Sequence, residues 1–338
     1  MEKGGAIGVC CQKLSEALEA LEQVNDVLIS NQVVDPNKLE LMIRINNQFI
    51  DKKLSICVDN EEVVAMMDRL IAKSSPTAKK LNVVIEYNVG QNRCGLNSEE
   101  EVLQFIQFIN NQCKYISFKG IQCYNGANQH IVEYEERRQA VERVVKKTEN
   151  LLTFLSQHDI QVNYVTGAGT GTWEFEATSG VFTEIQVGSY LFGDADYGKI
   201  KTKRNLSILE DEEHYFRQSL YILTTVISKT KDNSRFVVDA GLKASSIDSG
   251  VPLIDKNVKW REMVSPYIPG GDEHGIFNCK DSQEGRKVIS QIQIGDRIKL
   301  IPGHVDPTFN LYDQVVFFDP ENDKVTRVCD ISARGPGL

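Results

Sequence analysis

Short apolar runs alternate with segments of helical periodicity up to about residue 200. The runs have the length of buried strands, and they are Ala6–Cys11, Asp26–Ser30, Leu54–Asp59, Leu81–Tyr87, Ile116–Tyr124, Val162–Val165 and Thr183–Phe192. Between them, apolar residues recur at the spacing of one helix face, and the longest such segment is Glu135–His158. Strands separated by helices predict right-handed crossovers and a parallel sheet.

Seven strands of this kind predict an α/β fold of the (β/α)8-barrel type with one strand missing from the count. In that fold, ligands bind at the C-terminal ends of the strands. A doubly wound open sheet needs no eighth strand and is the structural alternative.

The pattern changes from about Asn205 onward. A helical segment is expected at Glu210–Ser228, and short alternating runs separated by turn residues follow it. These runs are Ser234–Asp239, Arg286–Ile294, Arg297–Ile301, Asp313–Phe318 and Val325–Ile331. They are typical of an antiparallel β domain. We therefore expect two domains, residues 1–203 and residues 204–338.

Composition narrows the class of protein. The net charge of −9 and the absence of a Lys/Arg cluster disfavour a nucleic-acid partner. No apolar run reaches membrane-spanning length, and the N-terminus does not read as a secretory signal, so no membrane partner is expected. The eight cysteines form no CxxC pair, which is typical of reduced thiols in a cytoplasmic protein.

The first candidate chemistry lies in the glycine-rich segment Gln161–Asp194. Small residues follow two strand-like runs, with Thr166 and Gly167 after one and Gly188 and Ser189 in the other. Backbone amides crowded at strand ends form nests that bind phosphate. Two ordinary turns are the alternative. A dinucleotide site is disfavoured because the required strand–turn–helix glycine pattern is missing.

Three further polar side chains lie at or just beyond the ends of predicted strands: Arg93, Tyr124 and His130. A fourth, Gln186, lies in the last predicted strand just before Gly188 and Ser189. In a barrel they would meet the phosphate nests at one mouth. A cation, a phenol and an imidazole beside phosphate nests suit an aromatic phosphorylated cofactor. For each residue singly, a loop side chain bonded to backbone is the alternative.

Seven segments carry a more specific signal: VVIEYNVGQNRCGL, QCYNGANQHI, VTGAGTGTWEFEATSGVFTE, QVGSYLFGDADY, VVDAGLKASSIDSG, GGDEHGIF and IPGHVDPTFNLYDQV. Together they resemble the D-threonine aldolase / D-serine dehydratase family. This family is a branch of the alanine-racemase-like, fold-type III enzymes, which use pyridoxal 5′-phosphate (PLP). The resemblance runs from Ile7 to Gly335 and implies a PLP-binding barrel followed by a β domain, assembled as a homodimer.

The resemblance also implies roles for single residues. Arg93 matches an arginine near the phenolic oxygen of PLP, and Tyr124 matches a tyrosine facing the pyridine nitrogen. A neutral phenol there would leave the nitrogen unprotonated and weaken the electron sink. The positions that match the surroundings of the phosphate and ring are Thr166, Gly167, Gln186, Gly188 and Ser189.

In the motif PGHVDPT, His304 and Asp306 match the divalent-metal pair of the family. On an extended strand, side chains two residues apart project to the same side, so both could reach one ion. Without the resemblance, this motif would be interpreted as a surface turn. The dehydratase branch carries cysteine in place of the aspartate. An oxygen ligand suits Mn²⁺ or Mg²⁺ better than Zn²⁺ and favours the aldolase branch.

The implied activity is a lyase reaction on a small-molecule substrate, a β-hydroxy-D-amino acid. The metal would lower the pKa of the β-hydroxyl, and His130 is the candidate base. Breaking the Cα–Cβ bond would give glycine and an aldehyde. The alternative outcome is dehydration of D-serine or 3-hydroxy-D-aspartate.

One family feature has no match in this sequence. The Schiff-base lysine of the family lies on the first barrel strand, upstream of the segment matching Ala6–Cys11, so we expect this chain to lack it. The lysine holds PLP covalently and returns it after each turnover. Three hypotheses follow: an enzyme with a truncated sequence, an inactive lysine-free paralogue that binds PLP non-covalently, or a regulatory subunit. In each case we expect little retro-aldol activity from the chain by itself.

Overall fold

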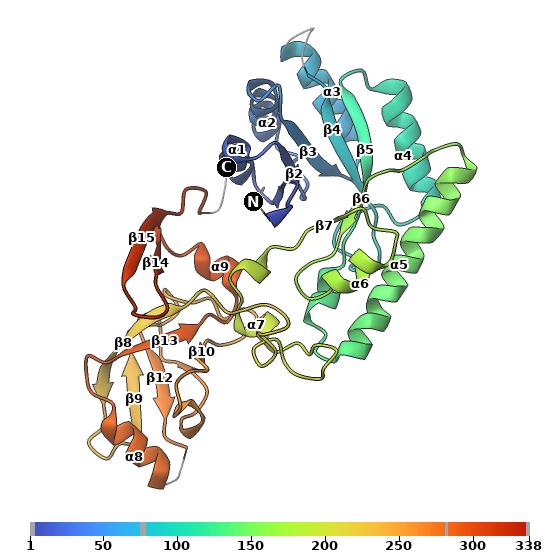
Figure 1. The fold of residues 1–338 in the computed structure, drawn as a ribbon. Coiled ribbons are helices and arrows are strands. Elements are labelled where there is room, and N and C mark those ends of the chain that lie inside the picture. The colour runs from blue at the N-terminus through green and yellow to red at the C-terminus, as the bar shows by residue number, and fades with distance from the viewer. Residues whose placement is uncertain (1–3, 75–78, 281–282, 336–338) are drawn as a thin grey trace. The chain divides into compact units, whose positions relative to one another are not determined.

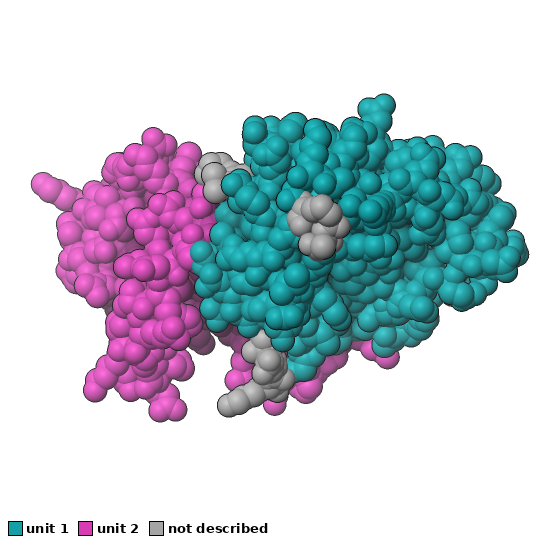
Figure 2. Space-filling view, turned by 90° about the horizontal axis from the view of Figure 1, so that it is seen from above, with its two compact units in different colours: residues 1–131, 135–187, 336–338 teal, residues 132–134, 188–335 magenta. Residues whose placement is uncertain are grey.

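The computed structural model describes residues 4–74, 79–280 and 283–335. The chain divides into two compact units, which have different colours in Figure 2. The first unit comprises residues 1–131, 135–187 and 336–338, and the second comprises residues 132–134 and 188–335. The expected domain boundary after residue 203 stays a prediction.

The first unit is built on a seven-stranded parallel sheet whose strands pair in chain order from β1 to β7. The strands are β1 (Val9–Cys11), β2 (Asp26–Ile29), β3 (Lys53–Val58), β4 (Leu81–Glu86), β5 (Ile116–Cys123), β6 (Val165–Gly167) and β7 (Glu184–Ile185). A doubly wound sheet reverses its strand order at a switch point, whereas this order continues in one direction. The barrel-type prediction is confirmed as a seven-stranded half-barrel, and the doubly wound alternative is wrong.

Helices connect the strands of this sheet, as Figure 1 shows. They are α1 (Leu14–Gln23), α2 (Pro36–Gln48), α3 (Glu61–Ser74), α4 (Glu99–Gln112), η2 (Gly126–His130), α5 (Tyr134–Gln157) and α6 (Trp173–Thr178). Local sequence fixes where they begin. Asp35 caps α2 with Pro36 at its first position, and Ser98 with Glu101 forms a capping box on α4.

The two faces of the parallel sheet bury different side chains. Ile56, Ile85 and Ile121 pack against the apolar faces of the helices and form the large core of this unit. A separate small cluster of Leu28, Cys57 and Val84 contacts Cys10 and Tyr164 on the inner face of the half-barrel. Their neighbours in sequence lie in the large core because successive side chains on a strand point to opposite faces.

Strands β6 and β7 differ from the sequence prediction. Strand β6 lies later than the expected run, and β7 contains only Glu184–Ile185. The amide of Gln186 still donates to Gly167 O, but the backbone turns at Gly188 into the short 3-10 helix η3 (Ser189–Leu191). The expected strand Thr183–Phe192 is therefore wrong over its second half.

The second unit contains a six-stranded antiparallel sheet in the order β10-β13-β8-β9-β12-β11 and a separate hairpin, β14–β15. The strands are β8 (Ile222–Lys229), β9 (Arg235–Val238), β10 (Leu253–Ile254), β11 (Ile268–Pro269), β12 (Gly275–Asn278), β13 (Arg297–Ile301), β14 (Gln314–Phe318) and β15 (Val325–Asp330). The helical elements after η3 are α7 (Ala195–Gly198), η4 (Arg261–Met263), α8 (Gln283–Gln291) and α9 (Val305–Phe309). The predicted antiparallel β domain is confirmed.

Two predicted elements of this unit are wrong. The expected helix Glu210–Ser228 is absent from these described residues, and β8 occupies its second half. The run of β-branched residues in ILTTVIS favours a strand, which pairs with β9 and β13. The expected strand Arg286–Ile294 largely forms helix α8, because Ile289 and Ile292 recur at helical spacing and are buried.

Among the described residues, no helix combines the length and apolar character needed to cross a lipid bilayer.

Candidate functional site

One row of polar side chains crosses four neighbouring strands of the parallel sheet. The strand register aligns Glu86 with Gln122, Gln122 with Thr166, and Thr166 with Glu184. Residues paired across adjacent strands project to the same face of a sheet. Ile85, next to Glu86, belongs to the core on the helix-covered face. The row therefore lies on the inner face, close to the C-terminal ends of the strands.

Hydrogen bonds join this row into a network. Gln186 Nε2 donates to Gln122 Oε1 and to Thr166 Oγ1, both at 2.9 Å. Thr166 Oγ1 donates to Glu184 Oε1 at 3.0 Å, and the Tyr164 hydroxyl donates to the same oxygen at 2.5 Å. Two predicted site residues, Thr166 and Gln186, are thus in direct contact.

Glu86 is a buried carboxylate at the other end of the row. Gln32 Nε2 donates to its Oε2 at 2.5 Å, and Gln122 lies opposite it on β5. Burial raises the pKa of Glu86 above its ordinary value, while the hydrogen bond from Gln32 and the charge of Arg93 oppose the rise. The site therefore holds a carboxylate beside the predicted cation.

Arg93 lies in a loop that returns to β4 through a bridge between Tyr87 and Leu96. The Asn88 side chain shapes this loop by accepting hydrogen bonds from the amides of Gly90 and Asn92. The Arg93 side chain is exposed, and its Cζ lies 5.8 Å from the centroid of the Tyr124 ring. The structure thus brings Arg93 and Tyr124 together as predicted, in a cation–π arrangement.

The glycines of the 166–172 turn permit close packing. A Cβ added to Gly169 would lie 2.6 Å from Gln129 Oε1, and one added to Gly171 would lie 2.3 Å from Gln129 O. A Cβ on Gly167 would lie 2.4 Å from Cys123 O. The Gly171 amide donates to Gln129 Oε1 at 2.9 Å, so Gln129 ties this turn to helix η2.

The same turn contains two amides that suit an anion. The whole segment 165–172 is buried, and Ala168 adopts the left-handed region with φ of 63°. Over the described part of the chain, no hydrogen bond is recorded for the backbone nitrogens of Ala168 and Gly169. Buried amides without a partner are rare in proteins, and adjacent amides at a left-handed residue form an anion-binding nest. This turn therefore fits a phosphate group.

His130 is the last residue of η2 and is exposed. Asn125 caps this short helix by accepting a hydrogen bond from the amide of Ala127. His130 thus follows Tyr124 on one well-defined connection after β5, and its role as a base stays a prediction.

The other four predicted residues belong to the second unit. Gly188 precedes η3, and a Cβ added there would meet nothing within 4 Å. Ser189 is the first residue of η3 and is half-buried. The role of both residues at the phosphate stays a prediction, as does that of His304 and Asp306 at a metal.

His304 and Asp306 do not lie on an extended strand, so that expectation is wrong. His304 precedes helix α9 and Asp306 lies in its first turn. The buried Asp194 explains this, because its Oδ2 accepts a hydrogen bond from the amide of Val305 at 2.8 Å and so fixes the helix start. The two side chains nevertheless approach each other, with Nε2 of His304 3.5 Å from Oδ2 of Asp306.

A second carboxylate also contacts His304. Asp248 Oδ2 lies 2.7 Å from Nδ1 of the imidazole. Asp306 and Asp248 raise the pKa of His304 to about 9, although burial opposes the rise. A metal ligand must be a neutral imidazole, so protons would compete with a metal for this residue. Across the described ranges, no group of three or more His, Cys, Asp or Glu side chains is arranged for a metal ion.

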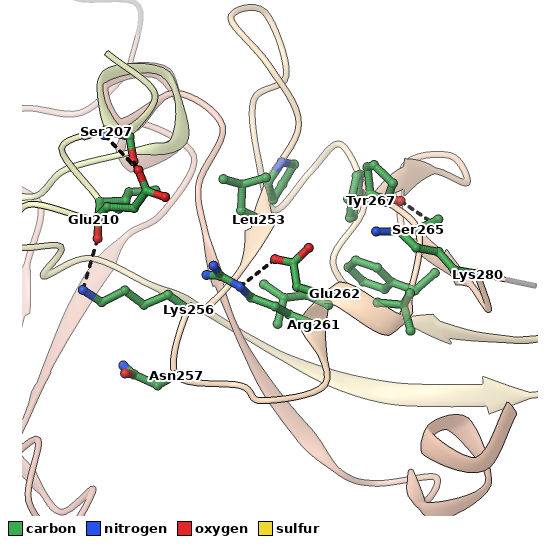
Figure 3. A pocket seen from close by; sticks show the side chains of 16 residues that line it. Ser207, Glu210, Leu253, Lys256, Asn257, Arg261, Glu262, Ser265, Tyr267 and Lys280 are labelled. Atoms are coloured by element: carbon green, nitrogen blue, oxygen red, sulfur yellow. Dashed lines mark hydrogen bonds and ion pairs between the residues drawn. The ribbon is translucent and has the colours of Figure 1, made fainter. Parts of the chain in front are cut away.

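The second unit also contains a cavity of about 600 Å³. Figure 3 shows Lys256, Arg261 and Glu262 between Glu210 on one side and Tyr267 on the other. Lys256 is already paired with Glu212, and Arg261 with Glu262. The cavity is lined by none of the residues predicted from the sequence, so it does not correspond to the predicted site.

Sequence reasoning missed Glu86, Gln122, Tyr164 and Glu184. A signal was present, because single polar residues interrupt otherwise apolar strands near their ends, as in VVIEY and GIQCY. Which of them meet depends on register between strands, and that information is not local in sequence.

Comparisons with known proteins agree with this architecture. A family model for the N-terminal domain of alanine racemase matches residues 1–196, and one for a putative serine dehydratase domain matches residues 219–318. The chain is 36% identical over 336 residues to a 3-hydroxy-D-aspartate aldolase of Paracoccus denitrificans (strain Pd 1222), covering 99% of this chain and 80% of that protein. It is 35% identical over 332 residues to a D-threonine aldolase of an Arthrobacter species, covering 98% and 80%.

Solved structures show the same fold. The crystal structure of D-threonine aldolase from Filomicrobium marinum superposes with a TM-score of 0.85 at 30% identity, covering 98% of this chain and 83% of that one. D-threo-3-hydroxyaspartate dehydratase from Delftia sp. HT23 shares the fold with a TM-score of 0.81 at 19% identity, covering 99% and 86%.

The fold and the family-model match define the class: this is an alanine-racemase-like protein of fold type III. Within that class, the chain belongs to the D-threonine aldolase / D-serine dehydratase-like family of PLP-dependent lyases.

Proposed function

We propose that the chain binds PLP at the strand ends of the first unit and acts in the retro-aldol cleavage of β-hydroxy-D-amino acids. The relatives at 35 to 36% identity are named aldolases, whereas those named dehydratases are 20 to 22% identical. The aldolase outcome is therefore favoured over dehydration. The observation that carries the proposal is the buried 166–172 turn with its two amides beside the polar row.

The residues present fit the cofactor. The amides of Ala168 and Gly169 would hold the phosphate, with Gly188 and Ser189 as further contacts. Arg93 would bind the phenolic oxygen through its guanidinium, and Tyr124 would face the ring nitrogen. When bound, PLP supplies an electron sink for the bond that breaks at Cα.

The remaining residues handle the substrate. His130 would remove the proton of the β-hydroxyl, which starts breakage of the Cα–Cβ bond. His304 and Asp306 would hold a divalent ion, and an imidazole with a carboxylate oxygen suits Mn²⁺, Mg²⁺ or Zn²⁺. That ion would lower the pKa of the same hydroxyl.

Binding tests this proposal most directly. We expect the purified chain to bind PLP with a phosphate-dependent affinity, measured by quenching of its tryptophan fluorescence, and to bind pyridoxal far more weakly. Arg93→Met should weaken PLP binding by about 10-fold, because a charge-assisted hydrogen bond is lost. Equal binding of PLP and pyridoxal would contradict the phosphate site.

Two further measurements test the reaction. Glycine release from D-threonine, with L-threonine as the control, tests the lyase reaction and its stereochemistry, and we again expect little release from this chain by itself. Isothermal titration with Mn²⁺ reports the metal, and we expect His304→Ala to abolish the metal binding. Activity that survives both His304→Ala and a chelator would exclude the metal pair from the mechanism.

We also propose a cytoplasmic homodimer. The family resemblance supports the dimer, and cysteines that form no disulfide within the described residues suit a reducing compartment. Light scattering coupled to size-exclusion chromatography measures the assembly, and a mass near 38.0 kDa would contradict the dimer.

A further inference from the structure

The hydrogen bonds around Gln186 have a fixed direction, because the carboxylate of Glu184 terminates the network beside Thr166. Glu184 accepts from the hydroxyls of Thr166 and Tyr164. Glu86, further along the row, accepts from the amide of Gln32. An ionised carboxylate accepts hydrogen bonds and donates none. Each of its partners must therefore donate toward it.

The branch through Thr166 sets one contact of Gln186. A hydroxyl has a single proton, and Thr166 donates that proton to Glu184 at 3.0 Å. Its oxygen can then only accept from Gln186, whose Nε2 lies 2.9 Å away. The nitrogen of Gln186, and not its oxygen, must face Thr166.

Gln122 forms the other contact of Gln186. Gln122 lies opposite Glu86 in the strand register, and its Oε1 is turned toward Gln186. Oε1 accepts from Gln186 Nε2 at 2.9 Å. A flipped Gln186 would oppose two carbonyl oxygens at this distance. Both contacts thus agree with the same orientation of the Gln186 amide.

This arrangement uses both N–H groups of Gln186, so only its carbonyl oxygen remains for a further hydrogen bond. Within the described residues, Gln186 Oε1 has no recorded hydrogen bond. A side-chain amide has two donors on nitrogen and one acceptor oxygen. Gln186 can therefore offer a ligand only an acceptor.

We infer that Glu184 is a positioning residue that, through Thr166, holds Gln186 Oε1 as a hydrogen-bond acceptor toward the bound ligand, so the ligand edge that meets it carries an N–H or O–H donor. This inference rests on the proposed function and specifies it. A phosphate dianion has only acceptor oxygens and is excluded from this position. Gln186 therefore faces the ring of the ligand, and the phosphate lies elsewhere along the strand ends.

The orientation of Gln186 can be measured without any ligand. In a ¹⁵N-labelled chain, the Gln186 side-chain amide is identified as the signal lost in Gln186→Met. Because both of its protons are bonded, we expect slow exchange with water. Glu184→Met removes the terminal acceptor and should speed this exchange by about 10-fold. Glu184→Gln keeps an acceptor oxygen and should stay within about 3-fold of the unaltered chain.

Binding of PLP tests the consequence for the ligand. Glu184→Met should weaken PLP binding by about 10-fold, with Glu184→Gln near the unaltered value. Thr166→Val should have a similar effect, and adding Glu184→Met to it should change little, because Glu184 acts through Thr166. The matched control is Glu19→Met, which alters an exposed carboxylate on α1 and should change neither readout.

Two PLP analogues identify the donor. One carries a methyl group on the 3-hydroxyl oxygen and the other carries a methyl group on the ring nitrogen, so each lacks one donor. The analogue that lacks the relevant donor should bind the unaltered chain and Glu184→Met equally. If both analogues still distinguish the two proteins by 10-fold, the inference is overturned.

Failure of the inference is distinguishable from failure of the proposed function. If PLP does not bind but Gln186 exchange responds to Glu184→Met, the orientation holds and the cofactor assignment fails. If PLP binds equally to the unaltered chain, Glu184→Met and Thr166→Val, the assignment stands and the positioning role is wrong.

Discussion

The two faces of the parallel sheet carry different kinds of side chain, although the same strands form both. On the helix-covered face, Ile56, Ile85 and Ile121 are fully buried among other apolar side chains. On the inner face, Glu86 and Glu184 each accept hydrogen bonds from polar side chains.

Alternate residues of one strand therefore have different roles: one set stabilises the fold and the other forms the candidate site. Apolar burial on one face supplies stability, and it does not depend on the identity of the polar partners opposite. The polar face needs each buried group to find a partner, so its arrangement is specific. Substitutions on the two faces should therefore differ in both size and kind.

The largest expected effect lies on the helix-covered face. Ile85→Ala should lower the free energy of unfolding by about 3 kcal/mol, because it removes buried methylene groups and leaves a cavity. Urea denaturation followed by circular dichroism measures the loss. Ile7→Ala is the control, since Ile7 is 72% exposed and should change stability by less than about 0.5 kcal/mol. A loss below about 1 kcal/mol for Ile85→Ala would contradict the assigned core.

The next effect concerns backbone approach next to Tyr164. A Cβ added to Gly120 would lie 2.0 Å from Tyr164 O, and a backbone oxygen cannot move aside easily. We expect Gly120→Ala to destabilise the chain by about 2 to 3 kcal/mol. The shift in thermal midpoint measures it. Gly4→Ala, where an added Cβ would meet nothing within 4 Å, should leave the midpoint unchanged.

A third test uses pH to distinguish the stability contribution of a buried carboxylate from that of the apolar core, which does not titrate. Glu176 in α6 is buried, and desolvation raises its pKa from the ordinary 4.5 to about 7. The folded state therefore favours the neutral carboxyl, and Glu176 lowers stability above pH 7. This penalty shrinks as the pH falls from about 7 toward 4.5.

The matching variant is Glu176→Gln, which cannot ionise. The stability difference between variant and unaltered chain should change by about 2 kcal/mol between pH 8 and pH 5, in favour of the variant at pH 8. Denaturation at both pH values measures it. Glu19→Gln, on the surface, should show no such change, and a pH-independent difference for Glu176→Gln would exclude the raised pKa.

The smallest expected effect on stability is that of substituting Lys119, which lies on the inner face. Lys119 Nζ lies 4.2 Å from the centroid of the Tyr164 ring and 3.4 Å from Asp26 Oδ1. Asp26 is partly exposed, so water screens this pair. Lys119→Met should therefore lower stability by less than about 1 kcal/mol, similar to the surface control Lys146→Met. A loss of several kcal/mol would show that the inner face carries stability as well.

The sequence predicted the fold of the first unit well, because the strands of its parallel sheet are buried on at least one complete face and therefore form clear apolar runs. Strands β3, β4 and β5 and helix α5 lie within a residue of their expected bounds. It failed at Glu210–Ser228 and Arg286–Ile294, where short segments of mixed composition satisfy both helical and strand periods. At the site, the contact between Arg93 and Tyr124 was expected, whereas Glu86 and Glu184 were missed.

By itself, the sequence determined the alternation of strands and helices, their order and the polar residues at the strand ends, because these follow from local periodicity and turn chemistry. Only the tertiary structure decided which polar residues share a row and in which direction their hydrogen bonds run. Register joins Glu86, Gln122, Thr166 and Glu184 across four strands, and partners so distant in sequence are selected by the packing of the whole sheet.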